Sequence, residues 1–384
     1  MIRKHKPINN KNALVLTGGG ARAAYQVGAL SAIAKYYPRN HIIPFPILSG
    51  TSAGAINTTA LACYASCFQL GVKKLEWVWK NFDIAQVYHC NASQLFGHVS
   101  SAMLTSFQAD YANKTPYSIL NNAPLRVLLN TLLDFNRIDQ NLSRNYLSAL
   151  SVTASSYSHG DSISFYQSAN NISPWSRSKR KGQQCQLNTE HLMASAAIPL
   201  VFPSVKIKNQ HFGDGSVHQL SPLSPAIHLG AERIFIIGVE QPKTPALINE
   251  SNPHPPSSAT IAGHLLDSIF ADTLHSDIER MNRVNATLKL ITQDKKDKID
   301  GLLNIDSFVL NPSHDFNAIA AEHYYDLPLP VRLLLRGAGI SNDSDSSIIS
   351  YLLFEKNFCS KLIKLGFDDA MAKEQEIRNF LAIT

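Results

Sequence analysis

The chain has 384 residues, of which 45% are hydrophobic and 17% charged, with a formal net charge of +6. This length allows one large domain or two ordinary ones, and the composition excludes wholesale disorder. No apolar run reaches the roughly 18–20 residues that span a bilayer. The basic N-terminus has no apolar stretch typical of a cleavable signal peptide. We expect a cytoplasmic or peripheral membrane protein, and secretion without a cleaved signal stays open.

Positive charge is concentrated at the start of the chain. The first acidic residue is Glu76, and nine basic residues precede it: Arg3, Lys4, Lys6, Lys11, Arg22, Lys35, Arg39, Lys73 and Lys74. An uncompensated positive segment suits an anionic substrate or an anionic membrane surface. The alternative is a solvated face that acidic residues from later in the chain neutralise.

The cysteines do not predict a metal site. Cys63 and Cys67 are one helical turn apart, but no nearby His or Cys pair completes a four-ligand set. Buried thiols are the better interpretation. Nothing in the spacing of the five cysteines indicates a disulfide framework.

The first 71 residues predict two strand–helix units. Asn12–Thr17 is an apolar run stopped by three glycines, and a helix is expected over Ala21–Tyr36. Phe45–Leu48 predicts a second short strand, followed by a helix from Ala53 to about Gly71. Consecutive strand–helix units favour an α/β fold with a parallel sheet.

The middle of the chain alternates between helical and strand patterns. Lys73–Asn141 is mostly helical, with Trp77 and Trp79 expected as core anchors. Leu147–Ser155 and Ile163–Gln167 predict a hairpin. The basic segment Ser176–Gly182 is expected to be an exposed loop, with membrane contact as the alternative.

The rest of the chain is expected to hold further strands and helices. In chain order we expect a helix over Thr189–Ala197, a strand over Val205–Phe212, a helix starting at Ser224, a strand over Arg233–Val239, a proline-rich mobile loop over 241–260, a helix over Ile261–Asn285, a strand over Ala286–Thr292 and a helical region from Asp315.

A candidate nucleophile lies at the second strand–helix junction. Gly50-Thr51-Ser52-Ala53-Gly54 is a G-x-S-x-G motif between a predicted strand and a predicted helix. In that context the serine is held in a strained turn with its hydroxyl projecting from the sheet edge, and the flanking Gly50 and Gly54 allow close packing. An ordinary glycine-rich turn is the alternative.

A glycine-rich loop follows the first strand. Gly18-Gly19-Gly20-Ala21-Arg22 leaves backbone N–H groups unobstructed at a helix start, where they can hold an oxyanion or a phosphate. Gly18-x-Gly20-x-x-Ala23 also fits a dinucleotide-binding fingerprint, which requires an acidic residue about 20 positions later. None occurs before Glu76, so a nucleotide-binding oxidoreductase is the weaker hypothesis.

A carboxylate flanked by glycines, Asp214 in Gly213-Asp214-Gly215, directly follows a predicted strand. Alone it is more typical of a turn. The usual hydrolase order of serine, acid and histidine does not fit, because no histidine after Asp214 lies in a motif-like context. His218, His228, His314 and His323 are expected to be surface or capping residues.

Together these motifs closely resemble the patatin-like phospholipases. The C-terminal region, with Ser350-Tyr351-Leu352-Leu353-Phe354, looks similar to a bacterial branch of that family. The family pairs a glycine-rich oxyanion loop after the first strand with G-x-S-x-G after the second and a later Asp-Gly motif. Ala194–Pro199 with Phe202-Pro203 also matches a segment that the family places shortly before its aspartate. Two positions depart from the family pattern: Ala23 replaces a common glycine, and Ser216 follows Asp214-Gly215.

The resemblance implies a three-layer α/β/α fold with a mostly parallel sheet and a helical C-terminal extension. Its catalytic domain is expected over 12–240, and the remaining sheet and helix elements over 261–384. It implies a lipid acyl hydrolase in which Ser52 is the nucleophile and Asp214 the proton acceptor. Gly18, Gly19, Gly20 and Arg22 would form the oxyanion and substrate-binding loop, and Gly50, Gly54 and Gly215 would support it.

The resemblance also limits the partners. We expect a lipid substrate, contact with an anionic membrane surface, and no metal, organic cofactor or nucleic acid. Arg22 could attract a phosphate or brace the glycine loop. A catalytically silent lipid-binding protein on the same fold is the main alternative.

Overall fold

The computed structural model describes residues 11–89, 118–242, 302–337 and 347–383, together with 261, 263, 265, 267–269 and 273–291. In these residues ten strands form one sheet: β1 (Asn12–Leu16), β2 (Ile47–Thr51), β3 (Ala149–Ser156), β4 (Ser162–Ser168), β5 (Ser176–Arg177), β6 (Arg180–Gln184), β7 (Val205–Ile207), β8 (Gln210–Asp214), β9 (Arg233–Ile237) and β10 (Asp306–Leu310).

The sheet is mostly parallel at its centre. Its main path runs β10-β9-β1-β2-β3-β4-β6-β5, and all pairs from β10 to β3 are parallel. β4 and β8 both pair antiparallel with β3, and β7 pairs with β8. A mostly parallel sheet requires helical crossovers that cover both of its faces, and the predicted α/β class is confirmed.

Helices and short 3-10 turns connect the strands. They are η1 (Gly20–Ala23), α1 (Ala24–Ala34), α2 (Ala53–Cys63), α3 (Phe68–Lys80), α4 (Ile84–Val87), α6 (Ala123–Leu132), α7 (Asn136–Ser143), α8 (Thr189–Ser195), η3 (Gly215–His218), α9 (Ser224–His228), α11 (Thr273–Leu290), α13 (Phe316–Glu322), η5 (Tyr324–Asp326), α14 (Leu329–Gly337), α15 (Ile348–Leu352), α16 (Lys356–Ala372) and α17 (Glu374–Leu381).

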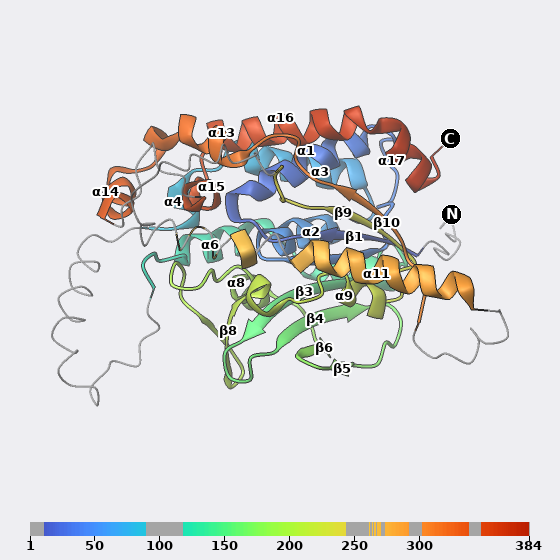
Figure 1. The fold of residues 1–384 in the computed structure, drawn as a ribbon. Helices are drawn as coiled ribbons and strands as arrows, with labels where there is room; N and C mark the ends of the chain where they lie inside the picture. Colours follow the sequence, from blue (N-terminus) through green and yellow to red (C-terminus); the bar gives the residue numbers. More distant parts are fainter. Residues whose placement is uncertain are drawn as a thin grey trace, which may run out of the picture.

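Two hydrophobic cores lie on opposite faces of the sheet. Leu14 and Leu16 of β1 pack with α1, α2, α3 and α16, whereas the alternate residues Ala13 and Val15 pack with α9 and α11. Successive side chains of a strand point to opposite faces, so β1 divides the two cores. Figure 1 shows α1 and α16 side by side along one side of the sheet and α11 with α9 on the other.

The C-terminal region shares the core with the first helix. A Cβ on Gly28 of α1 would lie 1.9 Å from the carbonyl oxygen of Ile363, and one on Gly366 of α16 would lie 2.0 Å from that of Tyr25. The two glycines therefore let α1 and α16 approach backbone to backbone. In the described part of the chain, no helix is long and apolar enough to cross a membrane.

The structure differs from the sequence-based elements near the start of the chain. The helix predicted from Ala53 to Gly71 is two helices, α2 and α3. The turn between them is hydrogen-bonded to the loop that precedes β2. The Ile43 N–H donates to the Ala65 carbonyl oxygen, and the Phe68 N–H donates to the His41 carbonyl oxygen. Trp79 is a core anchor at 2% exposure, but Trp77 is 66% exposed, so the expectation for Trp77 is wrong.

Two later expectations are also wrong. The strand predicted over Ala286–Thr292 is mainly the end of α11, because Leu274, Met281 and Leu288 recur every seventh residue and bury one helix face. The basic segment 176–182 is not a plain loop but part of the β5–β6 hairpin, which extends the sheet beside β4. The expected proline-rich loop at 241–260 lies outside the described residues from position 243 on.

Candidate active site

Ser52 occupies a strained turn between β2 and α2. Its φ of 54° and ψ of −130° are rare for any residue other than glycine. A Cβ on Gly50 would lie 2.3 Å from Thr58 Oγ1, and one on Gly54 would lie 2.3 Å from the Leu16 carbonyl oxygen. Both flanking glycines are therefore needed for strand and helix to meet this closely.

The structure brings Ser52 to Asp214. Ser52 Oγ donates a hydrogen bond of 2.6 Å to Asp214 Oδ2, although the residues are 162 positions apart in the sequence. β3 makes this possible, because its Thr153 pairs with Thr51 of β2 and its Ala154 with Asp214 of β8. Ser52 is 1% exposed and Asp214 is fully buried.

The Asp214 carboxylate is held on both oxygens. Oδ2 accepts the hydrogen bond from Ser52, and Oδ1 accepts from the Ser216 N–H at 2.9 Å. The backbone N–H of Asp214 donates to the Ala197 carbonyl at 2.8 Å. Burial raises the pKa of Asp214 from 3.8 to about 6, and the hydrogen bonds from Ser52 and Ser216 oppose the rise. A carboxylate with this pKa is a stronger base than usual and is still ionised at neutral pH.

Ser195 fixes the backbone of Ser52, a role that the sequence did not reveal. Its Oγ accepts from Ser52 N–H at 2.8 Å and donates to the Thr153 carbonyl at 2.6 Å. A Cβ on Gly215 would lie 2.1 Å from that same carbonyl oxygen. One signal in the sequence could have pointed to this role: Ser195 is a polar residue in the apolar segment Ala194–Pro199, which matches the family pattern.

The glycine loop offers free backbone donors beside Ser52. Gly18, Gly19 and Gly20 are buried, and Gly20 has a φ of 54°. Among the described residues, the N–H groups of Gly19 and Gly20 donate to no acceptor. Gly20 and Ser52 line the same cavity. Unpaired donors at a helix start are suited to stabilise an oxyanion.

A buried polar chain, also not anticipated, ties this loop to two helices. Gln26 Nε2 donates to the Thr17 carbonyl at 2.8 Å, just before the glycines, and Gln26 Oε1 accepts from Asn57 Nδ2 at 3.0 Å. Trp79 Nε1 in turn donates to Asn57 Oδ1 at 2.9 Å. A satisfied buried network of this kind holds its members in one arrangement.

Arg22 braces the glycine loop against the C-terminal half of the chain. Its side chain is 2% exposed. It donates hydrogen bonds of 2.9–3.1 Å to Ser350 Oγ, Tyr351 OH, Asn317 Oδ1 and Asp267 Oδ1, and its guanidinium lies 3.8 Å from the Tyr351 ring centroid. A Cβ on Gly20 would lie 2.3 Å from the Tyr351 carbonyl oxygen. Of the two roles open for Arg22, these contacts are those of a brace.

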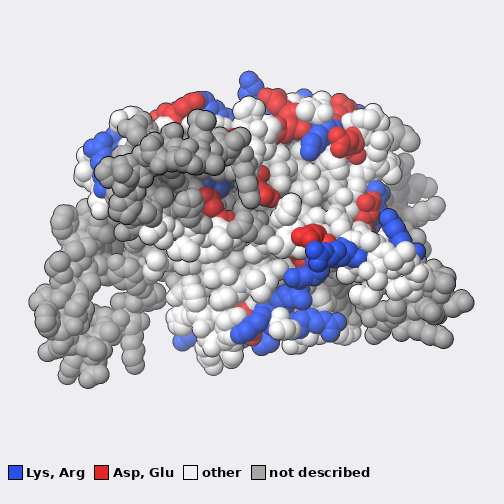
Figure 2. Space-filling model, viewed as in Figure 1, with Lys and Arg blue, Asp and Glu red and all other residues white. Residues whose placement is uncertain are grey.

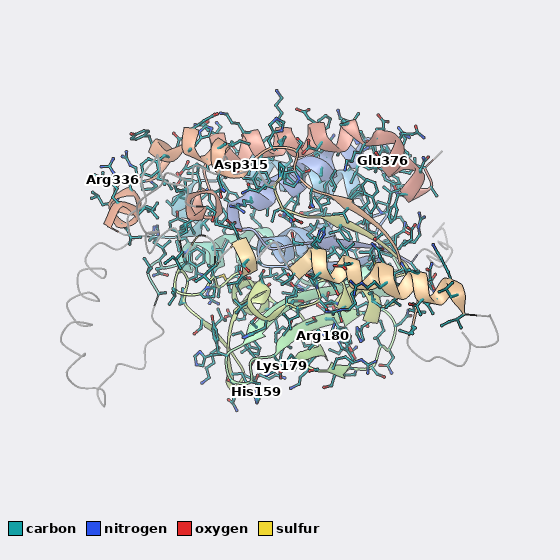
Figure 3. All side chains as sticks on the ribbon, in the orientation of Figure 1. His159, Lys179, Arg180, Asp315, Arg336 and Glu376 are labelled. Carbon is teal, nitrogen blue, oxygen red and sulfur yellow. The ribbon has the colours of Figure 1, made fainter. Side chains whose placement is uncertain are left out.

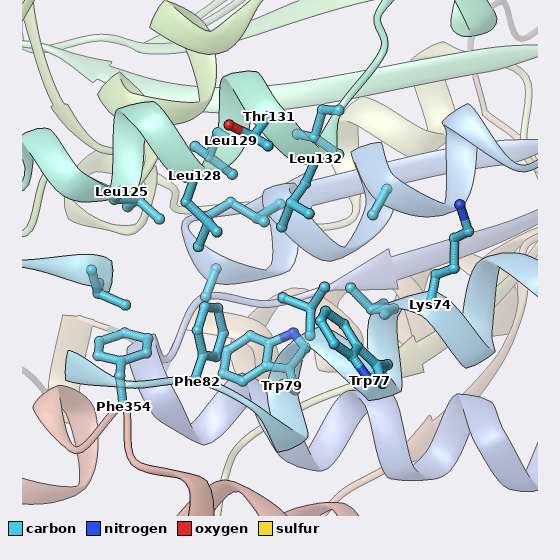
Figure 4. A pocket seen from close by; sticks show the side chains of 18 of the residues that line it. Lys74, Trp77, Trp79, Phe82, Leu125, Leu128, Leu129, Thr131, Leu132 and Phe354 are labelled. Carbon is cyan, nitrogen blue, oxygen red and sulfur yellow. The ribbon is translucent and has the colours of Figure 1, made fainter. Parts of the chain in front are cut away.

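A cavity of about 530 Å³ begins at the serine and is lined almost entirely by apolar side chains. Its walls come from α2, α3 and α6, with Phe82 and Phe354 at one end and Trp77 and Lys74 toward the other (Figure 4). An apolar cavity of this size matches a ligand pocket.

No histidine in the described residues hydrogen-bonds to Ser52 or Asp214. His218 donates its backbone N–H to Ser155 Oγ. His228 Nδ1 lies 2.8 Å from the Ser224 carbonyl, and His323 Nδ1 lies 2.9 Å from Asp326 Oδ2. His314 Nδ1 lies 2.7 Å from Ser313 Oγ. The side-chain contacts of His228, His314 and His323 are with residues at most four positions away.

The family model described as patatin-like phospholipase matches residues 14–227, more than half of the chain. The chain belongs to the patatin-like phospholipase family. Both members of the Ser52–Asp214 pair and the glycine loop lie inside the matched residues. The bacterial branch of the family remains an expectation.

Other comparisons add little to this assignment of the patatin-like chain. No curated protein matches it. It is similar to the crystal structure of VipD from Legionella pneumophila, with 13% identity and a TM-score of 0.35 over 98% of this chain and 67% of that chain. A TM-score this low carries no argument about fold or function.

The raised pKa of Asp214 predicts a pH-dependent effect of Asp214→Asn on stability. The folded-state pKa of about 6 exceeds the ordinary 3.8, so stability is lost as pH rises between these values. The rise corresponds to about 3 kcal/mol. Asparagine has no such titration. Urea unfolding should therefore show that the free energy of unfolding of the variant, relative to that of the wild type, increases by about this amount between pH ~4 and pH ~7.

The matched control is Asp368→Asn, an exposed aspartate of α16. The difference in the free energy of unfolding between Asp368→Asn and the wild type should stay constant over the same pH range. A constant difference for Asp214→Asn as well would contradict the raised pKa.

Proposed function

We propose that this patatin-like protein is a lipid acyl hydrolase of phospholipase A type with Ser52 as nucleophile and Asp214 as base. The observation that supports it best is the 2.6 Å hydrogen bond from Ser52 Oγ to the fully buried carboxylate of Asp214. A serine alone is a weak nucleophile, and an adjacent base within hydrogen-bond reach is what activates it.

The proposed reaction has two halves. Ser52 Oγ attacks the acyl carbon while its proton passes to Asp214, and Gly19 and Gly20 N–H groups stabilise the oxyanion. One such donor is typically worth about 3–4 kcal/mol. The leaving alcohol takes the proton from Asp214, which leaves an acyl-enzyme. Water then attacks the acyl carbon, its proton passes to Asp214 and on to Ser52, and the fatty acid is released.

The apolar cavity supports a lipid substrate. Apart from the serine itself, the charged and hydroxyl-bearing side chains in its lining are Lys73 and Lys74 on α3, Thr131 on α6 and Tyr64 at the end of α2. Burying an acyl chain here gains about 0.8 kcal/mol per methylene. A polar substrate would gain nothing comparable, so the wall favours an ester with a long hydrocarbon chain.

Substitutions of the pair test the mechanism. Ser52→Ala and Asp214→Asn should each reduce ester turnover by at least ~10³, because the two side chains act as one unit. For the same reason the double variant should be no less active than either single variant. A serine-directed fluorophosphonate should label the wild type and leave Ser52→Ala unlabelled. Near-normal turnover of Asp214→Asn would contradict the proposed base.

We also propose peripheral contact with an anionic membrane, but not through the N-terminal segment as a whole. Lys11 pairs with Glu232, and buried Arg22 pairs with Asp267 at 3.1 Å. The early positive charge is thus partly neutralised by acidic residues from later in the chain, which was the alternative interpretation.

A denser positive surface lies elsewhere. Figure 2 shows a strip of basic side chains that runs from α11 to the β5–β6 hairpin, and Figure 3 labels Lys179 and Arg180 at its lower end. We define this basic strip as Arg177, Lys179, Arg180, Arg280 and Arg283. Arg180 and Arg280 line one groove of about 190 Å³. Clustered cations of this kind attract anionic lipid headgroups.

Vesicle binding tests the basic strip. Each cation near an anionic surface contributes about 1 kcal/mol, so Arg177→Glu with Arg180→Glu should weaken binding about 30-fold or more. Binding is measured with Ser52→Ala protein, which leaves the lipid intact, on vesicles with and without anionic phosphatidylglycerol. Lys356→Glu with Lys364→Glu makes the same charge change on exposed positions of α16 and should weaken binding less. Equal losses would contradict a specific role of the strip.

A further inference from the structure

The groove in the basic strip lies on the other side of the sheet from Ser52. Its lining comes from α9, α11, the segment 302–305 and Arg180 of β6. α9 and α11 pack with the core that Ala13 and Val15 enter, whereas the cavity at Ser52 is lined by α2, α3 and α6. The groove and the candidate active site are therefore separate sites on opposite faces of the sheet.

Stacked rings hold one wall of the groove in place. The His228 ring of α9 stacks on Trp175 with centroids 4.7 Å apart, and Trp175 stacks on Tyr166 of β4 at 4.9 Å. A Cβ on Gly182 of β6 would lie 2.3 Å from the Trp175 ring, so β6 packs directly against the indole. The stack thus ties the β5–β6 hairpin, which carries Arg180, to α9, whose His228 lines the groove.

Two guanidinium groups line the groove from different elements. Arg180, labelled in Figure 3, comes from β6, and Arg280 comes from α11. Arg280 Nη1 donates to Ser221 Oγ at 3.1 Å, and the Arg280 side chain is 61% exposed. Among the described residues, the Arg180 guanidinium has no hydrogen-bond acceptor and no ion pair. A planar guanidinium can bind two oxygens of a phosphate or a carboxylate at once.

One carboxylate, that of Asp277, also lines the groove, but the protein engages both of its oxygens. Asp277 Oδ2 accepts from the Leu223 N–H at 3.0 Å, and Oδ1 lies 3.9 Å from Arg280 Nη1. His228 adds no charge at neutral pH, because burial lowers its pKa. Two arginines against one carboxylate leave an excess of one positive charge in the lining. This excess favours an anionic ligand.

The rest of the lining is apolar, and the groove is small. The apolar side chains are Leu223, Ile227, Met281, Val284, Leu302, Leu303 and Ile305. The volume of about 190 Å³ is below the ~300 Å³ at which pockets for drug-sized ligands begin. The groove therefore suits an anionic group with a few carbon atoms attached, and it is too small for a whole lipid.

We propose that this groove is a phosphate-binding site in which Arg180 and Arg280 bind oxygens of one phosphate group and the apolar lining contacts the carbon atoms attached to it. The ligand class is a phosphate ester, which a phospholipid headgroup and a soluble compound can both supply. For a headgroup, the inference rests on the proposed membrane contact of the basic strip. It does not depend on the hydrolase proposal. Arg177 and Arg283 belong to the strip but do not line the groove.

The first experiment is a calorimetric titration with inorganic phosphate and with butyl phosphate at constant ionic strength, which keeps charge screening unchanged. Butyl phosphate should bind more tightly, because its carbons contact the apolar lining. Arg180→Lys keeps the charge but loses the planar fork, so it should weaken binding of both compounds about tenfold, as expected for the loss of roughly one hydrogen bond to a charged group.

The matched control is Arg177→Lys, the same change at an exposed arginine of the strip that does not line the groove. It should leave both dissociation constants unchanged. Failure of both compounds to bind the wild type, or an equal loss of affinity in the two variants, would overturn the proposal.

A second variant blocks the groove and keeps both arginines. Val284 is a half-buried residue of α11 in the lining, and Val284→Trp would place an indole in a volume of about 190 Å³. Binding of butyl phosphate should be lost, while urea unfolding reports whether the variant is folded. A folded Val284→Trp protein with wild-type affinity would overturn the proposal. Arg180→Lys keeps the test valid if Val284→Trp does not fold, since the Arg180 guanidinium has no partner among the described residues.

Vesicle binding distinguishes a lipid headgroup from a soluble phosphate ester. Ser52→Ala protein is compared on phosphatidylglycerol vesicles with Arg180→Lys plus Arg280→Lys and with Arg177→Lys plus Arg283→Lys, four substitutions that conserve charge. If the headgroup is the ligand, the first pair should weaken binding about tenfold or more and the second should not. Butyl phosphate should then also compete with the vesicles. If only the titrations respond, the ligand is a soluble phosphate ester.

The two proposals fail in different ways. If neither lysine pair changes vesicle binding and neither compound titrates, the phosphate site is wrong, and the charge reversals described above still decide whether the strip attracts membranes. If those reversals leave vesicle binding unchanged but the affinity for butyl phosphate depends on Arg180, the membrane contact is wrong and the groove binds a soluble phosphate ester.

Discussion

The burial of one carboxylate next to a strained serine is the constraint on which the rest of the site depends. Asp214 is fully out of solvent, which raises its pKa to about 6. Burying a charge without partners is costly, and hydrogen bonds from Ser52 Oγ and Ser216 N–H offset part of that cost. In the mechanism that we propose, the geometry that stabilises the carboxylate is also the geometry that activates the serine.

β3 is the element that makes this geometry possible. It pairs with β2 on one edge and with β8 near its end, which brings the residue after Thr51 within reach of Asp214. The Thr153 carbonyl also accepts from Ser195, which in turn holds the backbone of Ser52. One strand of the sheet thus fixes the proposed nucleophile, its proposed base and the Ser195 side chain that supports the backbone of Ser52.

The C-terminal half of the chain completes the glycine loop. Arg22 is surrounded by Ser350, Tyr351, Asn317 and Asp267, and the Tyr351 backbone packs on Gly20. The free N–H groups of Gly19 and Gly20 keep their position only while these contacts hold. The region beyond residue 240 therefore belongs to the active-site structure, although the family match ends at residue 227.

Local patterns allowed the central fold to be predicted. The apolar runs and the glycines at 18–20, 50 and 54 are signals that depend only on residues close in the sequence. The α/β class and the strained turn at Ser52 could therefore be predicted. The hydrogen bonds from Ser52 to Ser195 and from Asn57 to Gln26 could not, because these partners are 143 and 31 positions apart in the chain. The expectation for Trp77 was wrong for a similar reason: whether a tryptophan is buried depends on which face of α3 packs against α1, α2 and α16.

The break between α2 and α3 and the extension of α11 show the same limit. A turn held by the loop at 41–43 has no signature of its own between Ala53 and Gly71. We expected a strand over 286–292, but the burial of one helix face at Leu274, Met281 and Leu288 is the stronger signal. In both segments, contacts with residues distant in the sequence determine the secondary structure.

The pH dependence of fluorophosphonate labelling at Ser52 tests the central claim most directly, because it reports the activation of the serine by its base. For the wild type, the labelling rate should rise through an inflection near pH 6 and reach a plateau above it, in line with the pKa of Asp214. Asp214→Asn should be labelled far more slowly and without that inflection. An Asp214→Asn protein that kept the wild-type rate and inflection would contradict the account and require another base.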